Sequence, residues 1–169
     1  MKLRQYCPAD ADAIVTWLKD ERAMRQWSAH WYASFPPSAD DMNRLYAQMT
    51  KDAHPVYLTA VDESGIVGHL LLRTVDAEAK IVRVGFVIVR DQKRGMGYGR
   101  EMLELAVQYG MEQMQAKKFT LGVFENNASA IKCYQAAGFH TVETDTPEIF
   151  AVFGETWRCL EMERDCAAG

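Results

Sequence analysis

The chain has 169 residues, of which 49% are hydrophobic and 25% are charged, and its formal net charge is −4. This length and composition favour one cored domain over residues 1–169, and they exclude a disordered or fibrous protein. The negative charge argues against a nucleic-acid partner bound through a broad basic face. Neither an apolar leader after Met1 nor a membrane-spanning apolar run is present, so we expect a cytoplasmic protein without a membrane partner.

Helical patterns dominate the first third of the chain. A short strand is expected over 2–6, and Pro8 can open the first helix. A second helix follows over about 21–28. Ser38 can cap a third helix, whose apolar stripe is Met42, Leu45, Tyr46 and Met49.

Strands replace helices after His54. Apolar residues alternate over 56–61, a turn follows at 62–65, and a partner strand is expected over 66–74. Residues 81–89 are rich in β-branched side chains, which is typical of a buried central strand. This pattern predicts three antiparallel strands in succession.

A glycine-rich loop, Arg94-Gly95-Met96-Gly97-Tyr98-Gly99-Arg100, separates this central strand from a helical pattern that ends near Met114. The glycines let a ligand approach the backbone, and the helix aims its first unpaired N–H groups at the same place. Such a loop predicts an anion site. A dinucleotide fingerprint would need glycine at Arg100, and the Gly-Lys-Ser/Thr of a nucleotide-triphosphate loop is missing.

The remaining elements complete a mixed sheet with helices on its faces. A strand is expected over 119–124, and Asn127 can cap a helix that Gly138 ends. Two final strands are expected over about 140–144 and 149–162.

Four cysteines are spread along the chain without a metal-binding spacing. We expect free, mostly buried thiols, no disulfide and no metal site. They are Cys7, Cys133, Cys159 and Cys166.

Two motifs in this order resemble the GNAT superfamily of N-acetyltransferases. Arg94, Gly97 and Gly99 fit its Gln/Arg-x-x-Gly-x-Gly/Ala signature after the fourth strand. About thirty residues later, Asn127, Ala130 and Tyr134 fit Asn-x-x-Ala-x-x-x-Tyr, and Gly138-Phe139 follows. The resemblance is specific over about Val82 to Phe139.

The resemblance implies an α/β (α+β) fold with a mixed, mostly antiparallel sheet of six to seven strands, helices on both faces, and splayed fourth and fifth strands. It also implies acetyl-coenzyme A (acetyl-CoA) as cofactor. The backbone of the fourth strand would pair with the pantetheine arm, the loop amides would hold the pyrophosphate, and Asn127 would contact the cofactor. The implied cofactor-binding residues are Val87, Ile88, Val89, Arg94, Gly95, Met96, Gly97, Tyr98, Gly99, Arg100 and Asn127.

Tyr134 matches the family position whose phenol protonates the departing thiolate. A tyrosine, with an ordinary pKa of about 10, is protonated at neutral pH as a general acid must be. An isolated tyrosine on a helix face would instead be interpreted as core packing. Its spacing from Asn127 favours the catalytic interpretation.

The implied acceptor is a primary amine, and the base that would deprotonate it is not evident. Two positions where the family often carries a glutamate hold Arg83 and Gly122. We assign no base and favour deprotonation through ordered water. The other groups considered were Glu125, Asp91, Glu78, Glu155 and His69, each more often structural or solvated.

The acceptor pocket and the oligomeric state are less constrained. Trp27, Trp31 and Tyr32 lie where the family often walls that pocket, and a hydrophobic plug is an equal alternative. The long final strand is compatible with a homodimer that places Trp157 at the interface. The alternative function is a non-catalytic acyl-CoA sensor or scaffold, which the two missing carboxylates favour slightly.

Overall fold

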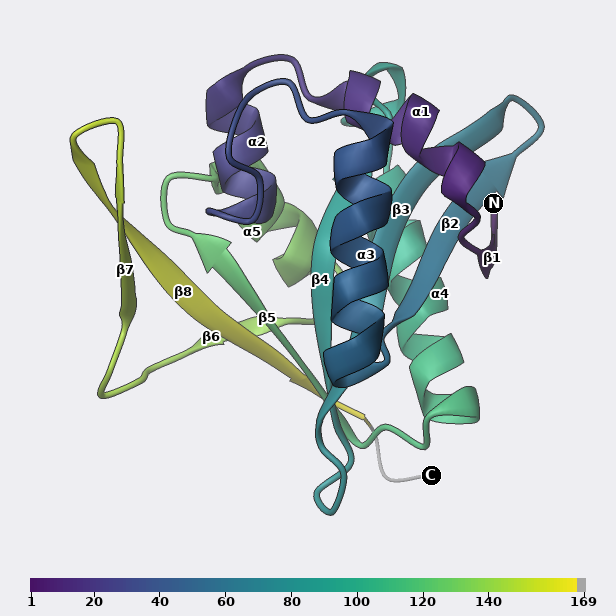
Figure 1. Cartoon of the computed structure of the whole chain (residues 1–169). Coiled ribbons are helices and arrows are strands. Elements are labelled where there is room, and N and C mark those ends of the chain that lie inside the picture. Colours follow the sequence, from purple (N-terminus) through teal and green to yellow (C-terminus); the bar gives the residue numbers. More distant parts are fainter. Residues whose placement is uncertain (167–169) are drawn as a thin grey trace.

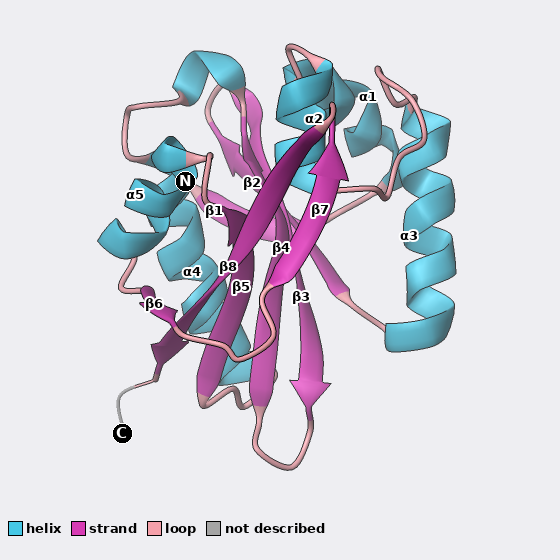
Figure 2. Ribbon diagram, turned by 90° about the vertical axis from the view of Figure 1, so that its left-hand side faces the viewer, coloured by secondary structure: helices cyan, strands magenta, loops and turns pink. Residues whose placement is uncertain are grey.

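The computed structural model describes residues 1–166. Eight strands form one sheet in the order β1-β2-β3-β4-β5-β8-β6, and β7 pairs with β8 beside this path. Among the strands of residues 1–166, only β4 and β5 run parallel; the other neighbours are antiparallel (Figures 1 and 2). The strands are β1 (Lys2–Gln5), β2 (Val56–Asp62), β3 (Gly65–Asp76), β4 (Ile81–Val89), β5 (Lys118–Phe124), β6 (His140–Val142), β7 (Glu148–Val152) and β8 (Glu155–Asp165).

Helices cover both faces of the sheet (Figure 2). The principal helices are α1 (Ala11–Ile14), α2 (Glu21–Ser28), α3 (Ala39–Ala53), α4 (Tyr98–Gln113) and α5 (Ala128–Ala136). Short 3₁₀ turns are η1 (Pro8–Asp10), η2 (Val15–Trp17) and η3 (Asp91–Lys93). None of the helices within residues 1–166 combines the length and apolarity needed to cross a membrane.

Alternating strand residues divide the core into two layers. Leu70 and Leu72 of β3 pack with α4 and α5 on one face, whereas Leu71 between them packs with α1, α2 and α3 on the other. Both layers are apolar because β2, β3 and β4 are covered on both sides. The β-branched sequence of β4 predicted such a buried central strand. The predicted mixed sheet with helices on both faces is confirmed.

The final strand differs from the prediction. Residues 148–165 form two strands, β7 and β8, because Phe153 (φ 54°) and Gly154 (φ 73°) make a tight turn between them. The sheet therefore has eight strands rather than six to seven. A strand pattern that continues across a two-residue turn conceals the turn unless its glycine is given weight.

The structural basis suggested for a dimer is wrong. Strand β8 pairs with β5, β6 and β7, so its edges are used within this chain. Trp157 is 3% exposed and packs against Phe124 and Val152. The expectation of mostly buried thiols is wrong too, because Cys7 is exposed and the other three cysteines are half-buried.

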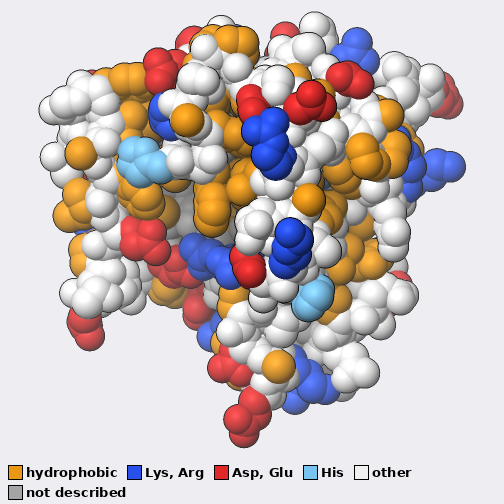
Figure 3. All heavy atoms as spheres, in the orientation of Figure 1, with side chains coloured by type: hydrophobic (Ala, Val, Ile, Leu, Met, Phe, Trp, Pro, Cys, Tyr) orange, Lys and Arg blue, Asp and Glu red, His pale blue; other side chains and the backbone are white. Residues whose placement is uncertain are grey.

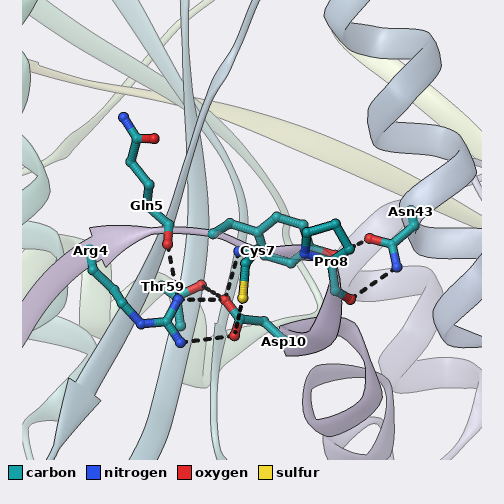
Figure 4. Close-up of polar contacts among 8 residues, drawn as sticks. Arg4, Gln5, Cys7, Pro8, Asp10, Asn43 and Thr59 are labelled. Carbon is teal, nitrogen blue, oxygen red and sulfur yellow. Dashed lines mark hydrogen bonds and ion pairs between the residues drawn. The ribbon is translucent and has the colours of Figure 1, made fainter.

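A polar cluster joins the α1–α3 layer to the sheet (Figure 4). The Arg4 guanidinium of β1 donates two hydrogen bonds of 2.8 Å to the Asp10 carboxylate, and Thr59 of β2 donates a third of 2.8 Å. Burial raises the pKa of Asp10, but the hydrogen bonds from Arg4, the Cys7 amide and Thr59 outweigh it and hold that pKa well below its usual range. Asn43 of α3 extends the cluster by donating to the Pro8 carbonyl at 3.0 Å.

Candidate active site

Strands β4 and β5 separate in the middle of the sheet. They pair over only three positions, from Ile81 opposite Lys118 to Arg83 opposite Thr120. Farther along, β4 carries one residue more than β3 between the Gly85–Leu71 and Ile88–His69 pairs, and Phe86 there has φ 50°. This bulge bends the strand. The outer half of β4 therefore pairs with β3 on one side and presents a free backbone edge to the gap on the other.

A cavity of about 360 Å³ lies in this gap. It is bordered by the outer half of β4, the glycine loop, β5 and the start of α5. Residues that line it include Val87, Ile88, Val89, Arg94, Gly95, Gly99, Asn127, Ser129, Ala130, Cys133 and Tyr134. The two sequence motifs, some thirty residues apart, thus meet around one cavity, which we call the donor cavity.

The glycine loop needs glycine for two different reasons. Gly95 (φ 72°) and Gly97 (φ 85°) are left-handed, a conformation that only glycine adopts at low cost, and Gly97 caps α4. A Cβ at either position would have no neighbour within 4 Å, so the space beside both is open. Position 99 requires glycine for a steric reason, because a Cβ there would lie 2.7 Å from the Cys133 sulfur. Gly99 allows α4 and α5 to approach closely.

Two polar side chains fix the borders of the donor cavity. The Arg94 guanidinium donates to the carbonyls of Val89 and Trp17, at 3.0 Å each, and so ties the loop to β4 and to the first helices. The Asn127 side chain caps α5 by accepting from the Ala130 amide at 3.4 Å. Both residues line the cavity, but their side-chain bonds are made within the protein.

Not every predicted cofactor residue lines the donor cavity. Gly97 lies in the loop but does not line the cavity, and Met96 is 63% exposed. Tyr98 turns away and donates to Asp62 at 2.8 Å, and Arg100 bonds Glu104 at 2.9 Å. The side chains of Met96, Tyr98 and Arg100 therefore do not reach the donor cavity.

Tyr134 of α5 reaches the donor cavity from its far side. It is 8% exposed, and its hydroxyl has no hydrogen-bond partner within residues 1–166. Burial, with a smaller contribution from the neighbouring Cys133 thiol, raises the pKa of Tyr134 well above its usual value. The phenol therefore carries its proton at neutral pH and has no internal acceptor for it.

A second cavity, of about 760 Å³, opens on the other side of the β4 bulge, and we call it the acceptor cavity. It lies between α2 and α3, the middle of the sheet, and β7. The face in Figure 3 is hollowed there, between α3 and the β7–β8 hairpin, with charged side chains of both signs at its border. The two cavities share lining residues, including Gln26, Trp27, Val84, Gly85, Phe86, Gly122 and Val123.

The three residues predicted to wall the acceptor pocket lie in different positions relative to the two cavities. Trp27 lines both cavities, and Trp31, 58% exposed, lines only the acceptor cavity. Tyr32 is 4% exposed and lines neither. It stacks behind Trp27 with ring centroids 5.8 Å apart. Tyr32 thus supports the wall rather than forming it.

An ion pair occupies the region where the family carries its glutamates. Arg83 of β4 donates to both carboxylate oxygens of Glu161 on β8, at 2.6 and 3.1 Å, and to Thr120 at 3.2 Å. To reach Glu161 the guanidinium passes over Gly122 of β5, where a Cβ would lie 2.9 Å from both the Arg83 Nη2 atom and the Cys159 sulfur. The Arg83–Glu161 ion pair thus depends on glycine at position 122, because a side chain there would crowd the guanidinium.

None of the other groups considered as a base lines either cavity. These are Glu125, Asp91, Glu78, Glu155 and His69. His69 is fully buried, 2.7 Å from the Tyr46 hydroxyl, and burial lowers its pKa to about 3. The carboxylates that do line the acceptor cavity are Asp52 and Glu148, and sequence analysis missed both. No local pattern marks them, since they come from the end of α3 and the start of β7.

Residues 1–140 match the family described as an acetyltransferase (GNAT) domain. The chain belongs to the GNAT family. Members of this family use acetyl-CoA. Of the motif positions, Arg94, Gly99, Asn127, Ala130 and Tyr134 line the donor cavity. The predicted splay of the fourth and fifth strands is also present.

Individual relatives acetylate amines according to their names. A spermine/spermidine N(1)-acetyltransferase of Bacillus subtilis is 37% identical over 51 residues, which are 30% of this chain and 34% of that protein. This match therefore spans about a third of the relative's length. The crystal structure of spermidine N-acetyltransferase from Vibrio cholerae with CoA and spermine covers 96% of this chain and 93% of its own, at 21% identity and a TM-score of 0.77.

An aminoglycoside acetyltransferase, AAC(6')-Ib in complex with coenzyme A and kanamycin, superposes with a TM-score of 0.72 at 15% identity. It covers 97% of this chain and 94% of its own. At these identities the two solved structures establish a shared fold and leave the acceptor of this chain open.

Proposed function

We propose that this chain is an acetyl-CoA-dependent N-acetyltransferase that transfers acetyl to a primary amine by direct attack. One observation carries the proposal: a free strand edge, the glycine loop and the Tyr134 phenol surround a cavity that shares seven lining residues with a second cavity. A cofactor can enter from one side of the β4 bulge and an amine from the other.

The donor cavity suits CoA by its backbone chemistry. The edge of the outer half of β4 that does not pair with β3 offers backbone groups to the amide-bearing pantetheine arm, as another strand would. Gly95–Arg100 and the first turn of α4 offer amides to the pyrophosphate, where each favourable charge–dipole contact adds about 0.3–1 kcal/mol. Asn127 stands beside this path at the start of α5.

The reaction forms a carbon–nitrogen bond, breaks a carbon–sulfur bond and moves protons from the amine and to the departing thiolate. The amine nitrogen attacks the thioester carbonyl, whose developing negative charge is stabilised by a backbone amide of the outer part of β4. Collapse of the tetrahedral intermediate breaks the carbon–sulfur bond, and Tyr134 gives its proton to the departing thiolate. No acyl-enzyme is required, and Cys133, whose thiol pKa is raised by burial, is a poor nucleophile.

Deprotonation of the amine is assigned to water in the acceptor cavity. Deprotonating an amine with a pKa of about 10.4 costs about 4.6 kcal/mol of free energy at pH 7. The Arg83–Glu161 pair offers no base, since Glu161 is engaged by both guanidinium nitrogens. Asp52 and Glu148 are the carboxylates that such water can reach.

The test is thiol release from acetyl-CoA with a panel of primary amines, measured for the wild type and Tyr134→Phe. We expect at least one amine to accelerate release, and Tyr134→Phe to lower kcat without weakening CoA binding by calorimetry. Binding of CoA with no acceleration by any amine would instead support a sensor, which the missing glutamates at Arg83 and Gly122 favour.

A further inference from the structure

Arg73 of β3 is an arginine without a counter-charge at the border of the acceptor cavity. Within residues 1–166 its guanidinium has no hydrogen-bond acceptor and no carboxylate at ion-pair distance. Burial, and then the like charge of Arg83, lowers the pKa of Arg73. The arginine is half-buried, so it gives up hydration and gains no bond within the protein in return.

The position of Arg73 in the sheet adds a second free-energy cost to its lack of a partner. It lies directly opposite Arg83 in the antiparallel β3–β4 pair, and like charges directly opposite each other destabilise a sheet. Arg83 is neutralised by Glu161, whereas Arg73 has no such partner. Both side chains line the acceptor cavity. An anion held in that cavity would remove the penalty.

From this arrangement we infer that the amine acceptor also carries a carboxylate, which pairs with Arg73 in the acceptor cavity. The inference rests on the proposed function, because it names the acceptor of the same site. A guanidinium is suited to a carboxylate by its two parallel N–H donors. Asp52 and Glu148 line the same cavity, but neither forms an ion pair with Arg73.

The distance along β4 between the level of Arg73 and Val87 sets the length of the acceptor. Arg73 is in register with Arg83, four residues before Val87, and a strand rises about 3.3 Å per residue, so the two levels are roughly 13 Å apart. An arginine side chain spans about half of this distance. The acceptor is therefore an amino acid whose reacting amine and carboxylate are separated by several bonds, rather than a polyamine, which would bring a further cation to Arg73.

The experiment compares matched ligands on the CoA-loaded protein by calorimetry. The probes are ω-amino acids with two to six methylenes, their uncharged amides, the corresponding aminophosphonates, and spermidine. We expect one of the carboxylates to bind at least tenfold more tightly than its amide, and the difference to vanish in Arg73→Gln. Arg73→Lys should keep part of it. Arg44→Gln, which removes a 75% exposed arginine on α3, is the matched control and should change nothing.

This readout is independent of turnover, so it separates the two proposals. A carboxylate preference without acetylation would retain the Arg73 assignment and defeat the proposed activity. Acetylation with equal binding of carboxylate and amide, or with tighter binding of spermidine or an aminophosphonate, would overturn the carboxylate and leave the activity standing. Loss of folding in Arg73→Gln is checked by its melting temperature, which we expect to rise without ligand because the repulsion from Arg83 is removed.

Discussion

The two cavities on either side of the β4 bulge are built in different ways. The donor cavity is lined mainly by two continuous segments, the β4–loop–α4 unit and the β5–α5 unit, with a few residues of the first helices beside them. The acceptor cavity uses side chains from α2, α3, β3, β4, β5 and β7. A site made from local backbone leaves a motif in the sequence, and one assembled from distant side chains does not. Variants that affect one cavity and spare the other test this division.

The largest effect is expected from Gly97→Glu. The substitution places a carboxylate where the loop amides would face pyrophosphate, and we expect CoA affinity to fall by at least about 100-fold through charge repulsion and lost charge-assisted hydrogen bonds. Calorimetry with CoA measures this change.

Gly154→Glu is a matched control for that variant. Gly154 has φ 73°, close to the 85° of Gly97, and a Cβ there also meets nothing within 4 Å, but it lies in the β7–β8 turn. It should carry the same backbone strain and retain CoA binding. Equal losses of affinity in the two variants would show that strain, rather than the loop's contact with an anion, is the cause.

Tyr134→Phe should lower kcat by about 100-fold, at the lower end of what a general acid contributes. Because the hydroxyl has no partner within the described residues, we expect the melting temperature and the CoA dissociation constant to remain close to wild type. Single-turnover thiol release checks the predicted loss of rate, and CoA calorimetry checks the unchanged dissociation constant. A matching loss of affinity would assign Tyr134 to binding instead.

Gly99→Ala tests the contact between α4 and α5. The new Cβ would lie 2.7 Å from the Cys133 sulfur, and overpacking costs about 1–3 kcal/mol, which exceeds the helix-propensity gain of about 0.5–1 kcal/mol from replacing glycine. Urea denaturation should show a net loss of stability.

A second substitution distinguishes this cause from others. Cys133→Ala removes the sulfur, so the double variant should recover most of the stability lost in Gly99→Ala. Additive losses in the double variant would mean that the close approach of the two helices is not the reason for glycine at 99.

Asp10→Asn should have the smallest effect, and it should act on the acceptor side. Loss of the charged partner of Arg4 and Thr59 is expected to cost about 1–2 kcal/mol, since hydrogen bonds to charged groups are worth more than neutral ones but Arg4 is 40% exposed. The α1–α3 layer would loosen, raising KM for the amine while the CoA dissociation constant stays constant.

The pH dependence of stability follows from the lowered pKa of Asp10. The folded state holds this pKa below the ordinary value of about 3.9, so the contribution is complete above that pH and is lost as the pH falls toward the folded pKa. Denaturation of the wild type from pH 6 to pH 3 should show the onset of this loss, and Asp10→Asn should lack this component. Parallel curves for the two proteins would contradict the assignment.

Much of the donor side could be predicted from the sequence because its determinants are local. Left-handed glycines at 95 and 97, a helix start at 98 and the Asn127 cap depend on neighbouring residues, and the structure has each of them. The division of the last strand at Phe153-Gly154 is local as well, but an unbroken β pattern on both sides concealed it.

The acceptor side could not be predicted in the same way. Arg73 is one of many charged strand residues until register places it opposite Arg83. Glu148 and Asp52 meet on one cavity only through the sheet order and the path of α3. Tyr32 and Trp31 are neighbours in the sequence, yet one is buried and the other exposed, because backbone direction in an irregular loop is set by tertiary packing.

The central claim is that the free β4 edge, the glycine loop and the start of α5 hold acetyl-CoA. Backbone amide hydrogen exchange with and without CoA tests it most directly. We predict CoA-dependent protection confined to residues 87–100 and 127–134, with little change over α3 and β7. Protection concentrated on α3 or β7, with residues 87–100 unchanged, would contradict the account.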